Sequence, residues 1–279
     1  MVKNAAFHQI DLGDISLEGY SRAAVQSYWR IPEWKVGFDL GAQPWDFMGT
    51  PTWFLTHAHL DHIAALPVYV ARRRMMKMEP PVIYLPESAV GPTEAILRNF
   101  SRLDRGRLPC SLVPLAADSE YELSRELVVT AHPTVHSIPS FGFVIWHRRR
   151  KLKPEYQGLS GDQIRDLRLA GTEVTAEQRF PLLGYTGDTS PAGLDQNPVF
   201  YQVKYLITEM TFLAKGHRRE KIHKHGHMHL DDFRERIDRF ENEKIILGHF
   251  SVRYSRPQIS KFIERAFPTL LDGRMIVCS

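Results

Sequence analysis

The sequence predicts an α/β fold in which helices and sheets are stacked in layers. Short apolar segments that suit strands alternate along the chain with amphipathic segments that suit helices, as is typical of layered α/β proteins. The chain has no internal repeat, no low-complexity tract and no Gly/Ser-rich or Pro-rich linker. With 279 residues, of which 43% are hydrophobic, it can bury a sizeable core, either as one large domain or as two closely packed halves.

The expected strands are short, often β-branched or aromatic, and mostly bounded by Gly, Pro or Asp. Eight segments fit this description: residues 36–40, 53–56, 82–85, 127–130, 141–146, 205–208, 245–247 and 275–278. The expected helices place apolar residues three and four positions apart, as Phe233, Ile237 and Phe240 do. Five segments have this spacing: residues 61–78, 87–103, 162–169, 231–240 and 256–267.

Residues 147–179 differ from the rest of the chain. This segment is polar, contains Gly158 and Gly161, and has weak hydrophobic periodicity. We therefore expect it to protrude from the fold as an arm or a long surface insertion.

Charge and cysteine content exclude several classes of protein. Lys and Arg number 36 and Asp and Glu number 32, so the formal net charge of +4 and the pI near 9.0 are compatible with a nucleic-acid partner without requiring one. Two cysteines, Cys110 and Cys278, are too few for a disulfide-stapled scaffold or a Cys-rich zinc ribbon, and they fit a reducing cytosol. Residues 1–14 lack a signal pattern, and no apolar run approaches the roughly 20 residues of a membrane helix. We expect a cytoplasmic protein with no membrane partner.

The placement of the 13 histidines is the most informative feature of the composition. Residues 56–62 read T-H-A-H-L-D-H, between an expected strand and an expected helix. His57 and His59 are alternate residues on a loop at a strand end and can point to one side. Asp61 and His62 turn with the helix start toward a neighbouring point. The motif therefore offers two ligands to each of two metal ions, and these groups suit zinc. The alternative is a run of surface histidines near a helix that Asp61 caps.

Two metal ions need further ligands, and candidates lie at the ends of later expected strands. His136 follows the strand at residues 127–130, with His132 as a rival candidate nearby. Asp188 lies in the turn G-Y-T-G-D-T-S, where a carboxylate could bridge both ions, and His249 follows another expected strand. Taken alone, each is an ordinary strand-end or turn residue. Together with the first motif, they complete a dinuclear site.

The order T-H-A-H-L-D-H, His136, G-D-T at Asp188 and His249 resembles the metallo-β-lactamase superfamily. The motifs T-E-M-T-F with Glu209 and H-G-H-M-H with His227 make the chain similar to the ribonuclease Z family, which trims the 3′ trailers of tRNA. The S-I-P-S-F-G-F turn and the H-F-S-V-R-Y motif strengthen this resemblance, which runs from about residue 36 to the C-terminus. The stretch K-P-E-Y-Q-G-L-S-G-D-Q-I looks like the short, single-module form of the enzyme.

Three departures from the family pattern stand out. The expected arm lacks the Gly-Pro-rich tip of many relatives, so the resemblance does not extend to the way the arm would hold tRNA. The motif after Gly226 reads H-M-H rather than H-S-T, and H-E-A-T-F is replaced by T-E-M-T-F. The last two changes leave Glu209 and His227 in place.

The resemblance implies the metallo-β-lactamase fold, a four-layer αβ/βα sandwich of two facing mixed sheets with outer helices. It implies a single domain over residues 1–279 with an arm-like insertion at about 147–179. It also implies two Zn²⁺ ions per chain, although the same ligands tolerate manganese or iron. The implied ligands are His57, His59 and His136 for one ion, Asp61, His62 and His249 for the other, and Asp188 as the bridge.

The implied activity is zinc-dependent endoribonuclease cleavage of precursor tRNA by hydroxide attack on a phosphodiester. Asp61 would be both a ligand and the residue that orients the nucleophile. His227, held and polarised by Glu209, would donate the proton that the leaving ribose oxygen needs. Ser140 and Arg253 are candidate phosphate contacts. The expected partners are precursor tRNA and a second copy of the chain in a homodimer.

Two other functions are open at this point. The first is another hydrolase on the same dinuclear site: a phosphodiesterase for small or cyclic nucleotides, an arylsulfatase-like enzyme, or a thioester or lactone hydrolase. Glu209, His227 and the arm favour ribonuclease Z over these. The second is a non-catalytic RNA-binding or scaffold module with a vestigial site. The intact ligand set counts against it, because a scaffold has no need of Asp61 between two histidines.

Overall fold

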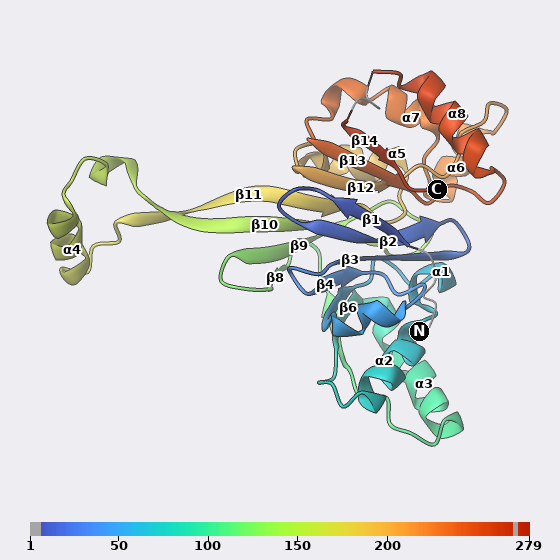
Figure 1. Ribbon diagram of the computed structural model, residues 1–279, viewed down its shortest axis with the longest axis horizontal. Helices are drawn as coiled ribbons and strands as arrows, with labels where there is room; N and C mark the ends of the chain where they lie inside the picture. The colour runs from blue at the N-terminus through green and yellow to red at the C-terminus, as the bar shows by residue number, and fades with distance from the viewer. Residues whose placement is uncertain (1–6, 270–272) are drawn as a thin grey trace.

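The computed structural model describes residues 7–269 and 273–279. Two seven-stranded mixed sheets face each other, and helices cover the outer face of each sheet (Figure 1). The predicted four-layer α/β sandwich is therefore confirmed. Among the described residues, no helix combines the length and apolar character that crossing a membrane requires.

The first sheet contains the N-terminal strands in sequence order. Neighbouring strands pair antiparallel from β1 to β4 and parallel from β4 to β7. Helices occupy the parallel crossovers and cover the outer face, as such connections require (Figure 1). The strands are β1 (His8–Asp11), β2 (Ser16–Arg22), β3 (Gln26–Ile31), β4 (Val36–Phe38), β5 (Thr52–Phe54), β6 (Val82–Pro86) and β7 (Ser111–Leu115). The helical elements are η1 (Trp45–Gly49), α1 (Leu60–Ile63), α2 (Leu66–Met75) and α3 (Glu87–Leu103).

The second sheet has the matching arrangement. Its strands pair antiparallel from β8 to β11 and parallel from β11 to β14. The strands are β8 (Glu120–Glu122), β9 (Leu127–Pro133), β10 (Phe141–Leu152), β11 (Thr175–Tyr185), β12 (Tyr205–Glu209), β13 (Lys244–Gly248) and β14 (Met275–Val277). The helical elements on this side are α5 (Pro191–Gln196), η3 (Pro198–Tyr201), α6 (Arg219–Lys224), α7 (Leu230–Arg234), η4 (Ile237–Arg239) and α8 (Arg256–Ala266).

Three apolar clusters separate the four layers. The central one lies between the sheets and contains the fully buried rings of Phe38, Phe54 and Phe143. The others lie between each sheet and its own helices, around Phe233 on one side and Trp53 on the other. Burying each large apolar side chain contributes roughly 1.5–3 kcal/mol. The central cluster takes residues from both sheets, so the two halves of the chain share one core.

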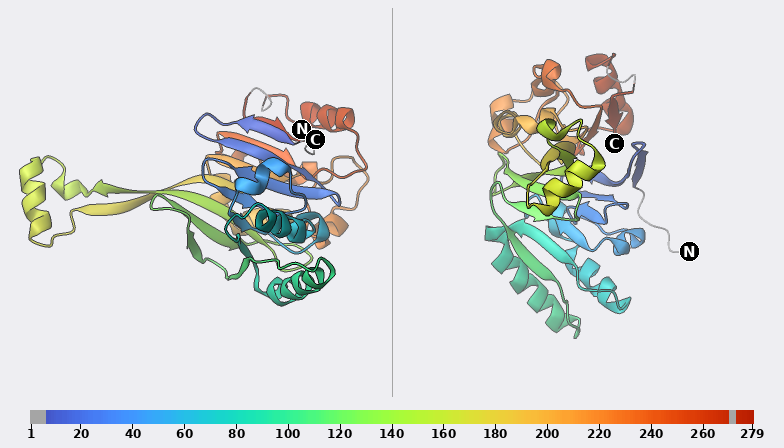
Figure 2. Two further views of the ribbon diagram at one scale, coloured as in Figure 1. Left: turned by 60° about the horizontal axis from the view of Figure 1, so that its bottom comes forward. Right: turned by 90° about the vertical axis from the view of Figure 1, so that its left-hand side faces the viewer.

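The strands β10 and β11 continue past the sheet as a long two-stranded hairpin (Figures 1 and 2). Its outer part pairs His147 with Phe180 and continues to the pair Leu152 and Thr175. The tip contains η2 (Pro154–Tyr156) and α4 (Gly161–Leu169). A capping box at Ser160 stabilises the N-terminus of α4. Residues 147–179 thus contain strands that the sequence did not indicate. Since solvent covers both faces of the hairpin, its side chains are polar on both and show no apolar alternation.

Two expected helices are wrong in extent. The segment 61–78 contains α1 and α2 with a break between them, because Pro67 lies in the first turn of α2 and cannot continue a preceding helix. The segment 231–240 contains the short α7 and the 3₁₀ turn η4 rather than one helix. Several strands were not expected, including β2, whose inward face carries Gly19 and Ser21 in place of apolar residues.

The strand ends that feed the site lie at one edge of the sandwich. In the first sheet, β4 and β5 run parallel and end next to each other. In the second, β11, β12 and β13 are parallel, and β9 has the same direction because two antiparallel steps separate it from β11. Loops that follow these strands therefore converge from both sheets, which is where ligands collect in layered α/β folds.

Candidate metal centre

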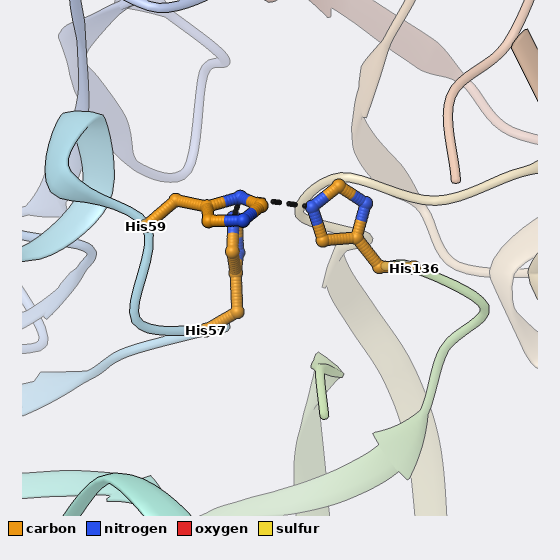
Figure 3. A group of neighbouring side chains, drawn as sticks. All are labelled: His57, His59 and His136. Atoms are coloured by element: carbon orange, nitrogen blue, oxygen red, sulfur yellow. Dashed lines mark hydrogen bonds between the residues drawn. The ribbon is translucent and has the colours of Figure 1, made fainter. Parts of the chain in front are cut away.

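His57, His59 and His136 bring three imidazoles together from both sheets (Figure 3). His57 and His59 follow β5, and His136 follows β9. One ring nitrogen from each lies within 4.8 Å of the others. Nδ1 of His59 is 3.1 Å from Nε2 of both His57 and His136. Facing imidazole nitrogens at these distances are donor atoms that suit a tetrahedral metal ion.

A second group of three lies beside the first. Asp61 and His62 are in α1, and His249 follows β13. Their ligand atoms also lie within 4.8 Å of one another. Nε2 of His249 is 3.5 Å from Oδ2 of Asp61 and 3.5 Å from Nε2 of His62. His249 has a φ of 58°, a left-handed backbone that non-glycine residues adopt rarely and that is concentrated at functional sites.

Asp188 lies between the two groups. Its Oδ2 is 3.8 Å from Nε2 of His57 in the first group. The same oxygen is 3.4 Å from Nε2 of His62 and 3.2 Å from Nε2 of His249 in the second. The carboxylate is almost fully buried. Two sets of three nitrogen and oxygen donors that share one buried carboxylate fit a pair of divalent ions.

The charge states of the two carboxylates and of His57 favour metal binding. Burial opposes ionisation of Asp61, but hydrogen bonding to His249 and the charge of His62 outweigh it and lower the pKa of Asp61 to about 2. The pKa of Asp188 likewise lies well below its usual value because the surrounding imidazoles outweigh its burial. Burial also lowers the pKa of His57 well below 6.5. Deprotonated carboxylates and neutral imidazoles are the forms that bind metals. Burial opposes the charged form of His62, but the carboxylate of Asp188 outweighs burial and raises the pKa of His62 well above 6.5, so a metal ion bound there would displace a proton.

Asp39, which the sequence analysis did not single out, fixes the orientation of His62. Its Oδ2 is 2.8 Å from Nδ1 of His62. A carboxylate can only accept, so Nδ1 carries the proton and Nε2 faces the centre. The backbone N–H of Thr56 and the hydroxyl of Tyr185 also donate to Asp39, each at 2.7 Å. The available signal was its position, since Asp39 directly follows a strand and β4 ends at the site edge.

Four of the imidazoles share this arrangement, in which Nδ1 donates to the protein and Nε2 faces the centre. Such contacts fix the tautomer and orientation of metal-binding histidines, and losing one commonly costs 10- to 100-fold in metal affinity. The pairs are His57 with Thr56 Oγ1 at 2.9 Å, His62 with Asp39, His136 with the Gly226 carbonyl at 2.9 Å, and His249 with Thr211 Oγ1 at 3.1 Å. The two threonine hydroxyls accept here because each donates its own proton to a carboxylate, Asp39 or Glu209.

His227 and Glu209 form a pair at the margin of the centre. Nδ1 of His227 donates to Oε1 of Glu209 at 3.1 Å. The backbone N–H groups of Thr189 and Met228 hold the buried Glu209 carboxylate at 2.8 and 3.2 Å. Burial disfavours the charged imidazole, but the carboxylate of Glu209 outweighs this effect and raises the pKa of His227 to about 9. The ring centroid of His227 is 5.1 Å from that of His136. A protonated imidazole therefore borders the candidate metal ligands.

An open cleft of about 660 Å³ lies beside these residues. Arg218, Lys221 and Arg253 line it together with His59 and His227. Among the residues that the structure describes, no carboxylate side chain lines this cleft, so the cleft is cationic. Such a lining suits an anionic substrate.

Of the remaining candidate residues, Arg253 lies at the cleft, whereas Ser140 and His132 do not. Arg253 lines the cleft, as does Ser137. Ser140, the serine chosen from the sequence, is buried with its hydroxyl 2.7 Å from that of Thr134. The rival histidine, His132, lies outside the centre, where its Nε2 is 2.7 Å from Thr130 Oγ1.

Comparison with known proteins agrees with this geometry. The family model described as the beta-lactamase superfamily domain matches residues 52–250, so the chain belongs to that superfamily. Its fold is similar to that of the metallo-beta-lactamase fold protein YhfI from Bacillus subtilis, with a TM-score of 0.61, 14% identity and coverage of 93% of this chain and 92% of the other.

Two curated relatives define the family more closely. The chain is 34% identical to tRNase Z TRZ1 of Arabidopsis thaliana over 261 residues, 93% of each protein. It is 36% identical to chloroplastic tRNase Z TRZ2 of the same plant over 256 residues, 91% of this chain and 72% of the relative. Within the superfamily, the chain belongs to the tRNase Z family. The resemblance to ribonuclease Z seen in the sequence is confirmed.

Proposed function

We propose that this protein is a metal-dependent endoribonuclease that removes 3′ trailers from precursor tRNA. The observation that carries the proposal is the position of the His227–Glu209 pair beside two donor groups that share Asp188. Membership of the tRNase Z family supports RNA as the substrate over small phosphodiesters, sulfates, thioesters or lactones. The cationic cleft supports a polyanionic substrate.

We assign two Zn²⁺ ions to the site. His57, His59 and His136 would hold one, Asp61, His62 and His249 the other, and Asp188 would contact both. When bound, the ions would activate water for attack and neutralise charge on the phosphodiester.

The residues of the chain supply orientation and a proton. Asp61 is fixed by the backbone N–H of Ala24, which donates to its Oδ2 at 2.8 Å, so the carboxylate can orient the nucleophile. His227 donates a proton to the leaving 3′ oxygen of the ribose, and Glu209 holds the imidazole in position through Nδ1. A positioned general acid contributes about 10²- to 10⁴-fold to the rate. Arg253 in the cleft holds a phosphate.

The base of the hairpin arm supports an extended RNA contact. A groove there is lined by Arg125, Arg148, Arg149, Arg150 and Lys151, together with two glutamates. Arg148 pairs with Glu122, and Arg150 pairs with Glu173. The groove still has an excess of cations, which suits a nucleic-acid backbone.

We further propose that residues 1–279 form a single domain with the arm as an insertion and that two chains form a homodimer. The shared central core supports the single domain. Apolar side chains exposed on α2 and α3, namely Met75, Ile96, Phe100 and Leu103, support an interface between copies. Sedimentation of the wild-type protein and of Leu103→Asp tests this. We expect a dimer and a monomer, respectively, and a monomeric wild-type protein would contradict the proposal.

We also propose a cytoplasmic location. Both cysteines are free, as expected in a reducing compartment. Relatives include a chloroplastic tRNase Z of Arabidopsis thaliana and a nuclear ribonuclease Z of Triticum aestivum, so fractionation of a tagged chain is the direct test.

Cleavage of a 3′-extended precursor tRNA, with and without a chelator, tests the proposed function. We expect a cut near the discriminator base that the chelator abolishes and zinc restores. Asp61→Ala should abolish it as well. The matched control is Asp14→Ala, because Asp14 is an exposed carboxylate that pairs with Lys204 away from the site. Hydrolysis of bis(p-nitrophenyl) phosphate without tRNA binding or cleavage would contradict the proposal.

A further inference from the structure

Phe212 lies beside the metal centre but belongs neither to the metal ligands nor to the His227–Glu209 pair. Its ring is partly exposed and lines the cleft beside the metal centre. Its backbone is held on both sides, because its N–H donates to the Met228 carbonyl at 3.1 Å and its carbonyl accepts from the Leu230 N–H at 2.8 Å. The chain therefore presents an apolar ring at a fixed place in an otherwise cationic cleft.

The neighbours of Phe212 are those expected around a bound nucleotide. The guanidinium carbon of Arg253 is 5.9 Å from the centroid of the Phe212 ring. The ring of His217 is 5.2 Å away, centroid to centroid, and Arg218 and Lys221 line the same cleft. An aromatic face stacks on any base, and adjacent cations bind the phosphates that flank it.

The position of His227 indicates which nucleotide Phe212 would contact. The His227 ring centroid is 6.3 Å from that of Phe212 on one side. It is 5.1 and 5.7 Å from those of His136 and His249, which belong to the metal centre. In the proposed reaction, His227 protonates the 3′ oxygen of the nucleotide before the scissile phosphate. With the phosphate at the metal centre, that nucleoside would extend past His227 toward Phe212.

We propose that Phe212 is the stacking platform for the base immediately 5′ of the scissile phosphate. This inference rests on the proposed nuclease function and adds the residue that positions the end of the mature RNA. Because stacking accepts every base, the platform would fix the place of the cut without requiring one nucleotide there.

The test combines variants of the protein with substrates that lack one base. A precursor RNA is prepared intact, with an abasic ribose immediately 5′ of the scissile phosphate, or with an abasic ribose immediately 3′ of it. Phe212→Leu keeps an apolar side chain but removes the flat ring, and Phe212→Trp restores a flat ring. Phe180→Leu is the matched control, since Phe180 is an exposed phenylalanine on the arm with the Lys151 ammonium 5.5 Å from its ring centroid. The kcat/KM of each combination is measured.

For the wild-type protein, we expect the 5′ abasic substrate to be cleaved on the order of 10- to 100-fold less efficiently than the intact one. In Phe212→Leu, the kcat/KM values for the 5′ abasic and intact substrates should differ by less than about 3-fold, because the ring on which the base stacks is gone. In Phe212→Trp, the kcat/KM for the 5′ abasic substrate should again fall below that for the intact one, as in the wild-type protein. In Phe180→Leu, the difference between these two substrates should equal that of the wild-type protein.

Three results would overturn the inference. One is a full 5′ abasic penalty in Phe212→Leu. Another is the absence of any such penalty in the wild-type protein. The third is a penalty confined to the 3′ abasic substrate. A wild-type protein that cleaves none of the RNAs would overturn the proposed function itself, and this inference with it.

Discussion

The carboxylate of Asp39 and the imidazole of His62 meet in a hydrogen bond of 2.8 Å, and both side chains are fully buried. Asp39 directly follows β4 in the first sheet, whereas His62 lies in α1 after the next strand, β5. Their contact turns Nε2 of His62 toward Asp188 and His249. It is one of four such contacts, so the metal centre depends on a surrounding set of fixed acceptors as much as on its ligands.

Asp39→Asn should weaken metal binding about 10- to 100-fold, because a neutral amide accepts the Nδ1 proton of His62 less strongly than a carboxylate. Asparagine tolerates the left-handed backbone that Asp39 adopts at a φ of 56°, so the change should not break the turn. Competition with a coloured zinc chelator measures the affinity. Asp14→Asn is the control for charge loss at an exposed position, and equal affinities for all three proteins would contradict the prediction.

His227→Ala should reduce kcat for precursor tRNA by about 10²- to 10⁴-fold, because it removes the proposed proton donor. Metal content should stay close to that of the wild-type protein, since His227 is assigned no metal. Single-turnover cleavage and elemental analysis of the same preparation measure both quantities. Loss of metal together with activity would show that His227 is a ligand instead.

Gly226→Ala should disrupt the metal centre, although the side chain of residue 226 is not a proposed ligand. A Cβ at this position would lie 2.3 Å from Cα and 2.6 Å from Nδ1 of His136, so this ligand would have to move. Gly216→Ala is the matched control. Gly216 also has a left-handed backbone, with a φ of 95°, but a Cβ there would meet no described atom within 4 Å.

Both glycine variants should therefore lose stability from backbone strain, on the order of 1 kcal/mol. Only Gly226→Ala should also lose metal. Thermal melting and zinc content distinguish the two effects, and a Gly226→Ala protein with a full complement of zinc would disprove the steric argument.

Asp195 should make stability depend on pH below 5. The hydrogen bond from Arg236 lowers the pKa of Asp195 from its usual 3.8 to about 2, with further contributions from Tyr201 and Arg239. Since folding lowers this pKa, the stabilisation is fully present above about pH 4–5 and is lost as the pH falls toward 2. Asp195→Asn should be less stable than the wild-type protein at pH 7, and the gap should narrow between pH 5 and pH 3.

Urea unfolding midpoints at pH 7, 5, 4 and 3 measure this gap. Asp162→Asn on the arm is the control, because Asp162 is 80% exposed and its pair with Arg165 contributes little. A gap between Asp195→Asn and the wild-type protein that is constant with pH would refute the assignment.

The fold class and the main histidine motif could be predicted from the sequence because both depend on local patterns. Apolar spacing identified eight of the strands, though not β2, β3 or β11, and it identified α3, whose predicted and observed bounds coincide. Histidines and a carboxylate in T-H-A-H-L-D-H are neighbours in sequence, so their chemistry is visible there. His136 and His249 were found because each follows an expected strand, and strands of one direction end at one edge. Asp188 was found from the turn G-Y-T-G-D-T-S that contains it.

Only the tertiary structure decided how these ligands are held and what surrounds them. Asp39, the Gly226 carbonyl and Thr211 are common groups whose importance comes from contacts with residues far away in the chain. The same holds for Phe212, which has no sequence signature that separates a cleft-lining ring from a core ring. Sequence patterns report which face of an element is apolar, whereas packing of two sheets decides which distant polar groups come within hydrogen-bonding distance.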